Sequence, residues 1–312
     1  MKAKYGVPWY CMTPEYQDSR HPGRVSNLNI RFADTLKVSG CEVELEFPVE
    51  NRLFDIKAGN VLVEVDPTFT HNSYVNCYSS SHEGLSPNYH LNKSKLAESH
   101  GYRCIHVWDW DDWEKVVRLV LPTSRRVYAR KCQVVELDKK VTDKFLNDNH
   151  LQGTCKGQTV RLGLMHNDEL VEVMTFGKPR YNRKFEWELL RLCALPGTSV
   201  VGGPSKLFSH FVKKCNPKSV LSYCDRSKFT GKVYQSIGMT LADEGTPNKH
   251  WYSPRKSERM QHVTNNFLLQ RGFDQIFGTS YGKGTDNEQL MFERGYLPVY
   301  DCGQMRFEWH SS

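Results

Sequence analysis

The sequence has 312 residues, 39% of them hydrophobic and 25% charged, with a formal net charge of +7. This length predicts two domains, and this composition excludes a disordered or collagen-like chain. No stretch approaches the ~20 apolar residues of a membrane span, so we expect a soluble cytoplasmic protein with no membrane partner. The ten cysteines form no C-x-x-C pair, which argues against a zinc ribbon or zinc finger.

The first part of the chain predicts a compact α-β-β-β-α-β series after an irregular arm over 1–25. The spacing of apolar residues predicts these elements. They are helices over 26–40 and 89–101 and strands over 41–51, 52–59, 60–72 and 102–110. Gly59-Asn60 predicts the hairpin turn between the second and third strands. The change of pattern at 121–124 predicts that a first domain covers 26–122.

The second part of the chain continues the mixed α/β pattern. A strand over 127–138 opens it, and a glycine turn, VVGG at 200–203, leads into a helix. A basic, polar helix over 255–272 and strands over 295–309 follow. We expect a second α/β domain over 123–254, with residues 255–312 packed on it.

Charge is divided unevenly between these parts. Residues 26–122 carry nine Lys/Arg against fourteen Asp/Glu, a net charge of −5, whereas residues 123–312 carry twenty-nine against nineteen, a net charge of +10. This pattern favours a part that holds a carboxylate cluster joined to a part that binds a polyanion. The alternative is that the positive charge is only a solvated surface.

The chemistry of the first domain lies in acidic side chains on the predicted hairpin. Glu64 and Asp66 differ by two positions and so point to one face of their strand, where Asp55 on the partner strand can join them. Burial of these carboxylates without a cation would cost several kcal/mol. Such oxygen ligands suit Mg²⁺ or Mn²⁺, which can activate water for attack on a phosphodiester.

Histidine and lysine side chains complete this predicted site. His71 follows the strand and could act as a general base, while His90 and Lys93 share one helix face and could supply a proton donor and a phosphate-binding cation. The alternative is a solvent-facing acidic strand and an idle loop histidine. The spacing D-x(8)-E-x-D-x(4)-H, then H-x(2)-K, favours metal ligands at Asp55, Glu64 and Asp66 and a catalytic set of Asp55, Glu64, His71, His90 and Lys93.

The segments FDIKAGNVLVEVDPTFTHN and YHLNKSKLAESHGYRCIHVWDWDDW resemble the EDxHD homing endonucleases of bacteriophages, which are similar to very-short-patch-repair endonucleases and the PD-(D/E)XK nuclease fold. This resemblance covers roughly 26–120 and implies metal-dependent cleavage of double-stranded DNA by a phage-encoded protein in a bacterial host cell. It implies that Asp55 is the principal metal-binding carboxylate and His71 the catalytic histidine. Relatives commonly carry Glu on the first helix, where this sequence has Asn29.

A second resemblance covers about 126–252. The segments WELLRLCALPG, VVGGPSKLFSHFVKK, VLSYCDRS and GKVYQSIGM look like the core of the GNAT acyltransferase fold, in which the glycine turn meets the pyrophosphate of acetyl-CoA. Tyr234 and Gly238 fall where that fold often has Tyr and Gly. The resemblance implies acyl transfer or a retained fold that binds DNA, and the positive charge favours the second.

Basic residues near an aromatic ring predict a DNA-binding surface, which consists of Arg180, Arg183 and Lys184 around Tyr181, together with Arg255, Lys256 and Arg259 on the last predicted helix. The alternative is an ordinary exposed basic helix. The full prediction is a nuclease-like domain followed by a GNAT-like domain. We expect it to act as a site-specific, metal-dependent endonuclease on double-stranded DNA, and to be either a monomer or a homodimer. Two alternatives are kept: a GNAT-type acyltransferase that modifies DNA bases, and a non-catalytic DNA-binding protein.

Overall fold

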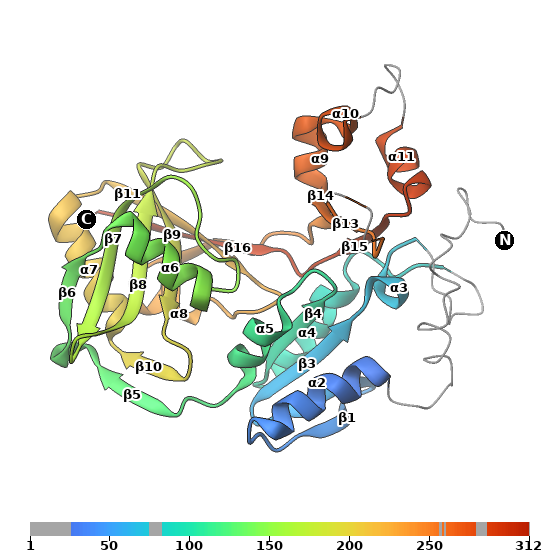
Figure 1. The fold of residues 1–312 in the computed structure, drawn as a ribbon, viewed down its shortest axis with the longest axis horizontal. Coiled ribbons are helices and arrows are strands. Elements are labelled where there is room, and N and C mark those ends of the chain that lie inside the picture. The colour runs from blue at the N-terminus through green and yellow to red at the C-terminus, as the bar shows by residue number, and fades with distance from the viewer. Residues whose placement is uncertain (1–25, 75–82, 256–257, 259, 279–285, 312) are drawn as a thin grey trace. The chain divides into compact units, whose positions relative to one another are not determined.

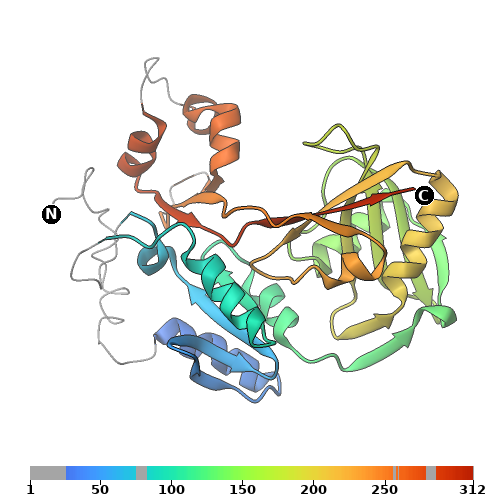
Figure 2. The ribbon, with the colours of Figure 1, turned by 180° about the vertical axis from the view of Figure 1, so that it is seen from behind.

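The computed structural model describes residues 26–74, 83–255, 258, 260–278 and 286–311. These residues form a mixed α/β structure that divides into two compact units, each built from separated stretches of the chain. The stretches 1–111, 225–229 and 246–304 belong to the first unit, and the stretches 112–224, 230–245 and 305–312 belong to the second. Figure 1 and Figure 2 show their helices and strands from opposite sides.

The N-terminal part of the first unit is a four-stranded sheet with the strand order β1-β2-β3-β4. Its strands are β1 (Glu44–Val49), β2 (Arg52–Ala58), β3 (Val61–Asp66) and β4 (Arg103–Trp108). The first three run antiparallel in sequence, whereas β4 pairs with β3 in parallel because helix α4 (Tyr89–Ser99) crosses between them. Helix α2 (Asn27–Val38) begins where the Ser26 side chain accepts the Asn29 N–H, and Gly59 forms the β2–β3 turn at φ +57°.

The predicted elements of this region are confirmed with one addition. The segment after β3 forms a single turn of helix, α3 (Thr68–His71), where the sequence predicts a strand end. Asn72 closes this turn because its side-chain amide donates to the carbonyl oxygens of Thr68 and Phe69. The turn fixes the direction in which His71 leaves the sheet.

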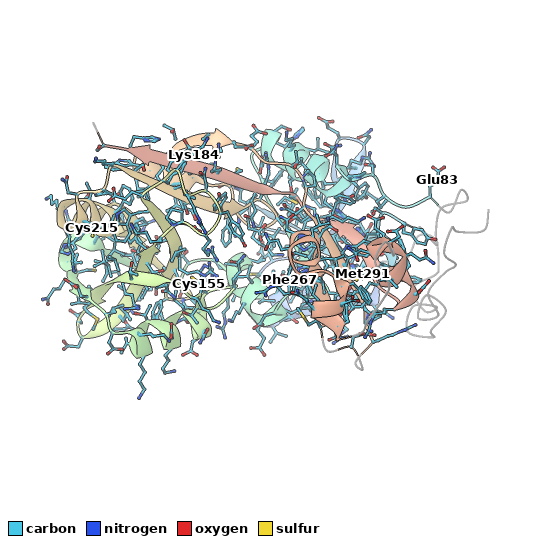
Figure 3. The ribbon with its side chains drawn as sticks, turned by 90° about the horizontal axis from the view of Figure 1, so that it is seen from above. Glu83, Cys155, Lys184, Cys215, Phe267 and Met291 are labelled. Carbon is cyan, nitrogen blue, oxygen red and sulfur yellow. The ribbon has the colours of Figure 1, made fainter. Side chains whose placement is uncertain are left out.

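The C-terminal part of the first unit is a three-stranded antiparallel sheet with helices beside it. Its elements are β13 (Lys249–Tyr252), β14 (His262–Thr264), β15 (Leu297–Tyr300), α9 (Asn265–Arg271), α10 (Phe273–Phe277) and α11 (Asn287–Glu293). Buried Trp251, Tyr296 and Met291 belong to its apolar core, and Figure 3 labels Met291 on α11 and Phe267 on α9.

The prediction of one helix over 255–272 is wrong for its described residues. His262–Thr264 pair with β13 as a strand, and Val263 lies buried opposite Trp251. The helix starts only at Asn265, where the Thr264 hydroxyl accepts the Phe267 N–H and so caps it. Burial of Val263 therefore outweighs the helical preference of the polar residues around it.

The second unit is built on a seven-stranded sheet with the order β12-β16-β11-β9-β8-β7-β6. Its strands are β6 (Gln133–Glu136), β7 (Gln158–His166), β8 (Glu169–Gly177), β9 (Trp187–Ala194), β11 (Ser219–Asp225), β12 (Thr240–Asp243) and β16 (Gln304–His310). Two short strands, β5 (Arg125–Tyr128) and β10 (Thr198–Val201), form a separate parallel pair. Helix α5 (Trp113–Val120) precedes them.

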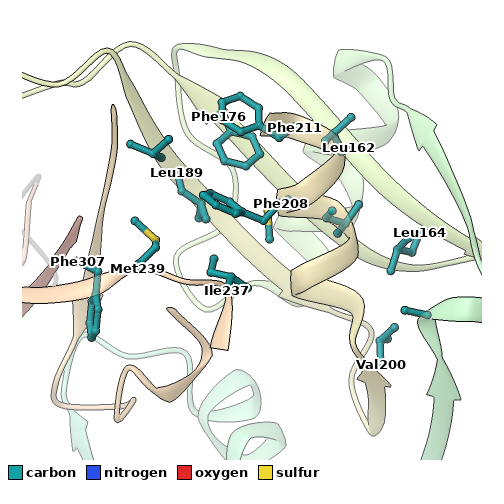
Figure 4. Close-up of a cluster of buried hydrophobic side chains, with 14 of the residues drawn as sticks. Leu162, Leu164, Phe176, Leu189, Val200, Phe208, Phe211, Ile237, Met239 and Phe307 are labelled. Carbon is teal, nitrogen blue, oxygen red and sulfur yellow. The ribbon is translucent and has the colours of Figure 1, made fainter. Parts of the chain in front are cut away.

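Two helices cover opposite faces of this sheet. Phe211 of α7 (Gly203–Cys215) stacks on Phe176 of β8 with ring centroids 3.6 Å apart, and Figure 4 shows the buried cluster around them. Phe145 of α6 (Lys139–Asn149) packs against Val173 and Cys193, whose side chains point to the other face. The short helix α8 (Lys232–Ser236) follows β11.

The predicted strand over 127–138 is wrong as a single element, because a 3₁₀ turn at Ala129–Lys131, labelled η2, divides β5 from β6. The Lys206 ammonium holds this turn in place, because it donates to the carbonyl oxygens of Ala129 and Cys132. Residues 255–304, predicted to pack with the second domain, are assigned to the first unit where they are described. Across the described residues, no helix has the length and apolar character to cross a membrane.

Candidate functional sites

A buried polar cluster lies at the carboxyl ends of β3 and β4 in the first unit. Glu64 and Asp66 on β3 are 1% and 0% exposed, as expected for a strand covered on both faces rather than an edge strand in solvent. Helix α4 brings His90 and Lys93 over the same region. The structure therefore gathers the acidic and basic side chains that the spacing pattern singles out, and it divides them into two groups.

The first group joins Asp55, Glu64 and Lys93. The Lys93 ammonium forms a buried ion pair with a Glu64 carboxylate oxygen and donates to the Leu53 carbonyl oxygen at 2.9 Å. Burial favours the neutral amine, but the Glu64 charge outweighs it and raises the pKa of Lys93. Asp55 accepts the Val65 N–H at 2.8 Å, and burial raises the pKa of Asp55.

The second group joins Asp66 to three histidines. One carboxylate oxygen of Asp66, Oδ2, accepts from His106 Nδ1 at 2.7 Å, while the other, Oδ1, lies 2.9 Å from His71 Nδ1 and 3.8 Å from His90 Nε2. Nδ1 of His71 and Nε2 of His90 are 3.2 Å apart. Among the residues that the structure describes, Asp66, His71 and His90 form the group whose ligand-type atoms all lie within 4.8 Å of one another.

Protonation in this second group follows from its charges. Burial favours protonated Asp66, but His71 and His106 outweigh it and lower the pKa of Asp66 well below its usual value. Burial lowers the pKa of His90 to about 3, so His90 is neutral near pH 7. Burial also opposes charge on His71, but Asp66 outweighs it and raises the pKa of His71.

The sequence pattern misses His106, which orients Asp66. Its signal is a histidine in the apolar run Cys104–Trp108, where every neighbour is buried. The parallel register sets Glu64 opposite His106, which places the histidine one step from Asp66. Since register cannot be read from one strand alone, the contact could not be predicted. The roles predicted for Asp55, Glu64, His71, His90 and Lys93 stay predictions.

A second candidate site lies at the glycine turn of the second unit. Gly202 caps α7 at φ +77°, in the left-handed region that favours glycine, and no side chain caps the first turn of this helix. A Cβ on Gly203 would lie 1.8 Å from Oε2 of Glu172, so glycine lets this carboxyl approach the helix start. Oε2 of Glu172 has no hydrogen-bond partner among the described atoms, and burial raises the pKa of Glu172 to about 8.

The strands beside this turn open away from each other. Strands β9 and β11 are parallel neighbours, but only two residue pairs join them, Trp187 with Val220 and Glu188 with Leu221. At the next residue, the Ser222 hydroxyl donates to the Leu189 carbonyl oxygen at 2.9 Å, in place of a main-chain donor. Tyr234 of α8 lies on the β11 side, with its hydroxyl 3.4 Å from the Tyr223 carbonyl oxygen.

The predicted DNA-binding residues lie in different settings. Arg180, Tyr181, Arg183 and Lys184 are exposed in the β8–β9 loop, where Glu188 holds Arg180 through an ion pair with Nη2 at 3.0 Å. Arg255 is half-buried and packs beside Gly295. Lys256 and Arg259 lie outside the described residues. Nothing in the structure tests whether these residues bind DNA.

No family model matches this chain, and no curated protein matches it. Three solved structures represent the fold matches. A Bacillus subtilis acetyltransferase in complex with CoA is 11% identical in sequence, with a TM-score of 0.31. The match covers 58% of this chain and 100% of that protein. A GNAT family acetyltransferase from Elizabethkingia anophelis with acetyl-CoA bound is 12% identical, with a TM-score of 0.31, and the match covers 58% of this chain and 99% of that protein. An IAA acetyltransferase from Bacillus cereus is 10% identical, with a TM-score of 0.31, and the match covers 58% of this chain and 99% of that protein.

These matches correct the main functional prediction. The matched structures are acetyltransferases, some with CoA or acetyl-CoA, so the prediction of a metal-dependent DNA endonuclease is wrong, as are the hydrolase and nuclease assignments and Mg²⁺ or Mn²⁺ as the main cofactor. Nothing in them supports the EDxHD resemblance. Lys93 forms an ion pair with Glu64, and whether Asp55, Glu64 and Asp66 bind a metal ion stays a prediction. TM-scores near 0.31 transfer no activity to this chain.

Proposed function

We propose that the second unit binds an acyl-CoA and transfers its acyl group to an acceptor. The observation that carries this proposal is the short pairing of β9 with β11, which is limited to two residue pairs, in the same unit as the glycine turn at Gly202. Parallel strands that separate leave main-chain amide and carbonyl groups without strand partners, and an extended ligand rich in amides can pair with such groups. The pantetheine arm of CoA is a ligand of this kind.

The start of α7 fits the pyrophosphate of such a ligand. An uncapped helix start presents main-chain N–H groups and the positive end of the helix dipole. The neighbouring Glu172 would repel an anion if it were charged, but its pKa of about 8 keeps it mostly protonated at pH 7. The same burial that removes its charge therefore keeps the helix start open to a phosphate group.

Tyr234 is the group that the structure offers for proton transfer. Burial raises the pKa of Tyr234 to about 12, so the phenol holds its proton at neutral pH. A bound acyl-CoA would supply an activated thioester. Tyr234, on the β11 side of the opening, would hold the proton that a departing thiolate needs.

We propose a nucleic acid, with double-stranded DNA as the partner, as the carrier of the acceptor group. The β8–β9 loop exposes Lys178, Arg180, Arg183 and Lys184 next to Tyr181, whose side chain is 71% exposed; Figure 3 labels Lys184. Cations of this density attract phosphates, and an exposed ring can stack on a base. Glu188 positions the Arg180 guanidinium through an ion pair, so at least this charge of the loop is held in place.

Calorimetric titration of the full chain with acetyl-CoA tests the cofactor proposal. We expect one binding site per chain and roughly tenfold weaker binding, about 1.4 kcal/mol, in Gly202→Val, because the side chain strains the turn and covers the helix start. Gly157→Val is the matched control, since Gly157 also has positive φ, at +86°, and open space around it, but lies before β7. No binding by the wild-type protein, or equal loss in both variants, would contradict the proposal.

A salt series of DNA-binding measurements tests the partner. The double variant Arg183→Ala/Lys184→Ala should weaken binding to duplex DNA and flatten the dependence of log K on log salt by close to two charges. Lys139→Ala/Lys144→Ala is the control, because these exposed lysines on α6 are paired with Asp143 and Asp148. Equal loss in the two double variants would show that only net charge matters.

A further inference from the structure

Three ligand-type atoms converge on one point in the first unit, far from any part of the proposed acyl-CoA site in sequence. They are Asp66 Oδ1, His71 Nδ1 and His90 Nε2, separated by 2.9, 3.2 and 3.8 Å. Repulsion between lone pairs would separate such atoms unless a proton or a cation lay between them. A proton on His71 Nδ1 can be shared between His90 Nε2 and Asp66 Oδ1, whereas a cation can bond to all three atoms at once.

The spacing of these atoms matches the bond lengths of a transition metal. A circle through three atoms with these separations has a radius of about 2.0 Å, and Zn–N and Zn–O bonds measure ~2.0–2.2 Å. An ion could therefore bond to all three atoms from a position slightly to one side of their plane. Tetrahedral geometry at these bond lengths requires ligand atoms about 3.3 Å apart, which is close to the mean of the three separations.

Neighbouring groups orient two of the three ligands, His90 and Asp66. His90 donates from Nδ1 to the Tyr300 carbonyl oxygen at 2.8 Å, and because a carbonyl only accepts, His90 Nε2 is left with its lone pair towards the site. His106 donates from Nδ1 to the other oxygen of Asp66, and the Ser94 hydroxyl contacts His106 Nε2 at 3.0 Å. Metal sites in proteins show this arrangement of outer hydrogen bonds.

A second, independent observation also indicates a ligand. Asp66 is fully buried, and its Oδ1 atom accepts no hydrogen bond of good geometry in the described part of the chain, although His71 Nδ1 lies 2.9 Å away. A buried carboxylate oxygen without a hydrogen-bond donor is costly. The side chain of His71 is 19% exposed, so an ion could enter from this side.

We propose that Asp66, His71 and His90 bind a divalent transition metal ion of the Zn²⁺, Fe²⁺ or Co²⁺ class. Two imidazoles and one carboxylate suit these ions, whereas Mg²⁺ prefers oxygen ligands and water. The three described ligands leave positions open for water or a small oxygen-bearing ligand. Because the site lies in the first unit, its loss and a loss of acyl-CoA binding in the second unit are separate results.

Titration of the metal-stripped full chain with Co²⁺ and Zn²⁺ tests this proposal. We expect one ion per chain, a visible Co²⁺ spectrum of a site with nitrogen and oxygen ligands, and displacement by Zn²⁺ but not by millimolar Mg²⁺. His71→Gln and Asp66→Asn should weaken Zn²⁺ binding by more than about 100-fold, because loss of a ligand exceeds the 10- to 100-fold effect of an outer hydrogen bond.

His100→Gln is the matched control, because His100 lies at the end of the same helix, α4, and its partners among the described residues are Glu50, Ser99 and Leu96 rather than the three ligands. It should retain wild-type Zn²⁺ affinity. Circular dichroism shows whether each variant folds, and if Asp66→Asn does not, His71→Gln decides because its side chain reaches solvent. Failure of the wild-type protein to bind Co²⁺ or Zn²⁺, or equal binding by wild type and folded His71→Gln, would overturn the proposal.

Discussion

Glu172→Gln should stabilise the second unit at neutral pH by an amount that grows with pH. Glu172 is 3% exposed, and burial raises its pKa from 4.5 to about 8. The folded state therefore binds a proton that the unfolded state releases between these pH values, and the free energy of unfolding falls as pH rises through this window. Each pH unit contributes about 1.4 kcal/mol, so the effect reaches about 3 kcal/mol at pH 7.

Urea denaturation of wild type and Glu172→Gln at several pH values between 4.5 and 8 measures this effect. The variant lacks the titrating group, so the difference in unfolding free energy should be near zero at the acidic end and widen towards pH 8. Glu169→Gln is the matched control on the same strand, where solvent reaches the carboxylate. A difference between Glu172→Gln and wild type that stays constant with pH would refute the burial argument.

Three further substitutions, with Leu269→Ala as the control for the first, test a packed ring, a helix cap and an ion pair. Phe211→Ala should lower the free energy of unfolding, measured by chemical denaturation, by roughly 3–5 kcal/mol because it removes a fully buried ring. Leu269 is 68% exposed, so Leu269→Ala should change this free energy by less than about 0.5 kcal/mol. Thr264→Ala removes the cap of α9 and should cost about 1 kcal/mol and increase amide exchange in that helix. Lys228→Met removes the buried cation that pairs with Asp111, whose side chain is 10% exposed, and should lower the melting temperature, with a loss of roughly 3–5 kcal/mol. Wild-type stability of Lys228→Met would show that the pair is dispensable.

Local signals in the sequence were enough to predict the strands of the four-stranded sheet in the first unit. Gly59 at positive φ sets the β2–β3 hairpin, and the two-residue period of β3 puts Glu64 and Asp66 together. The same logic fails over 255–272, because pairing of Val263 with β13 depends on a strand that the local pattern does not contain. Non-local pairing, rather than propensity, decides that segment.

The candidate sites show the same limit. The pattern from Asp55 to Lys93 identifies the side chains but not their partners. Helix α4 places Lys93 beside Glu64, and the register of β4 on β3 places His106 beside Asp66. Glu172 has no motif of its own, and only the approach of Gly203 makes it notable. Buried polar residues in apolar strands are the signal that could have found both His106 and Glu172.

The carbonyl group that orients His90 belongs to Tyr300, 210 residues further along the chain. A ribosome must therefore complete almost the whole polypeptide before this histidine acquires its partner. The chain also passes from one unit to the other five times, so neither unit is a continuous stretch that a simple truncation could isolate. A chain that ends before residue 300 would lack the carbonyl that orients His90, so this site can be completed only after the last strand of the first unit has been made.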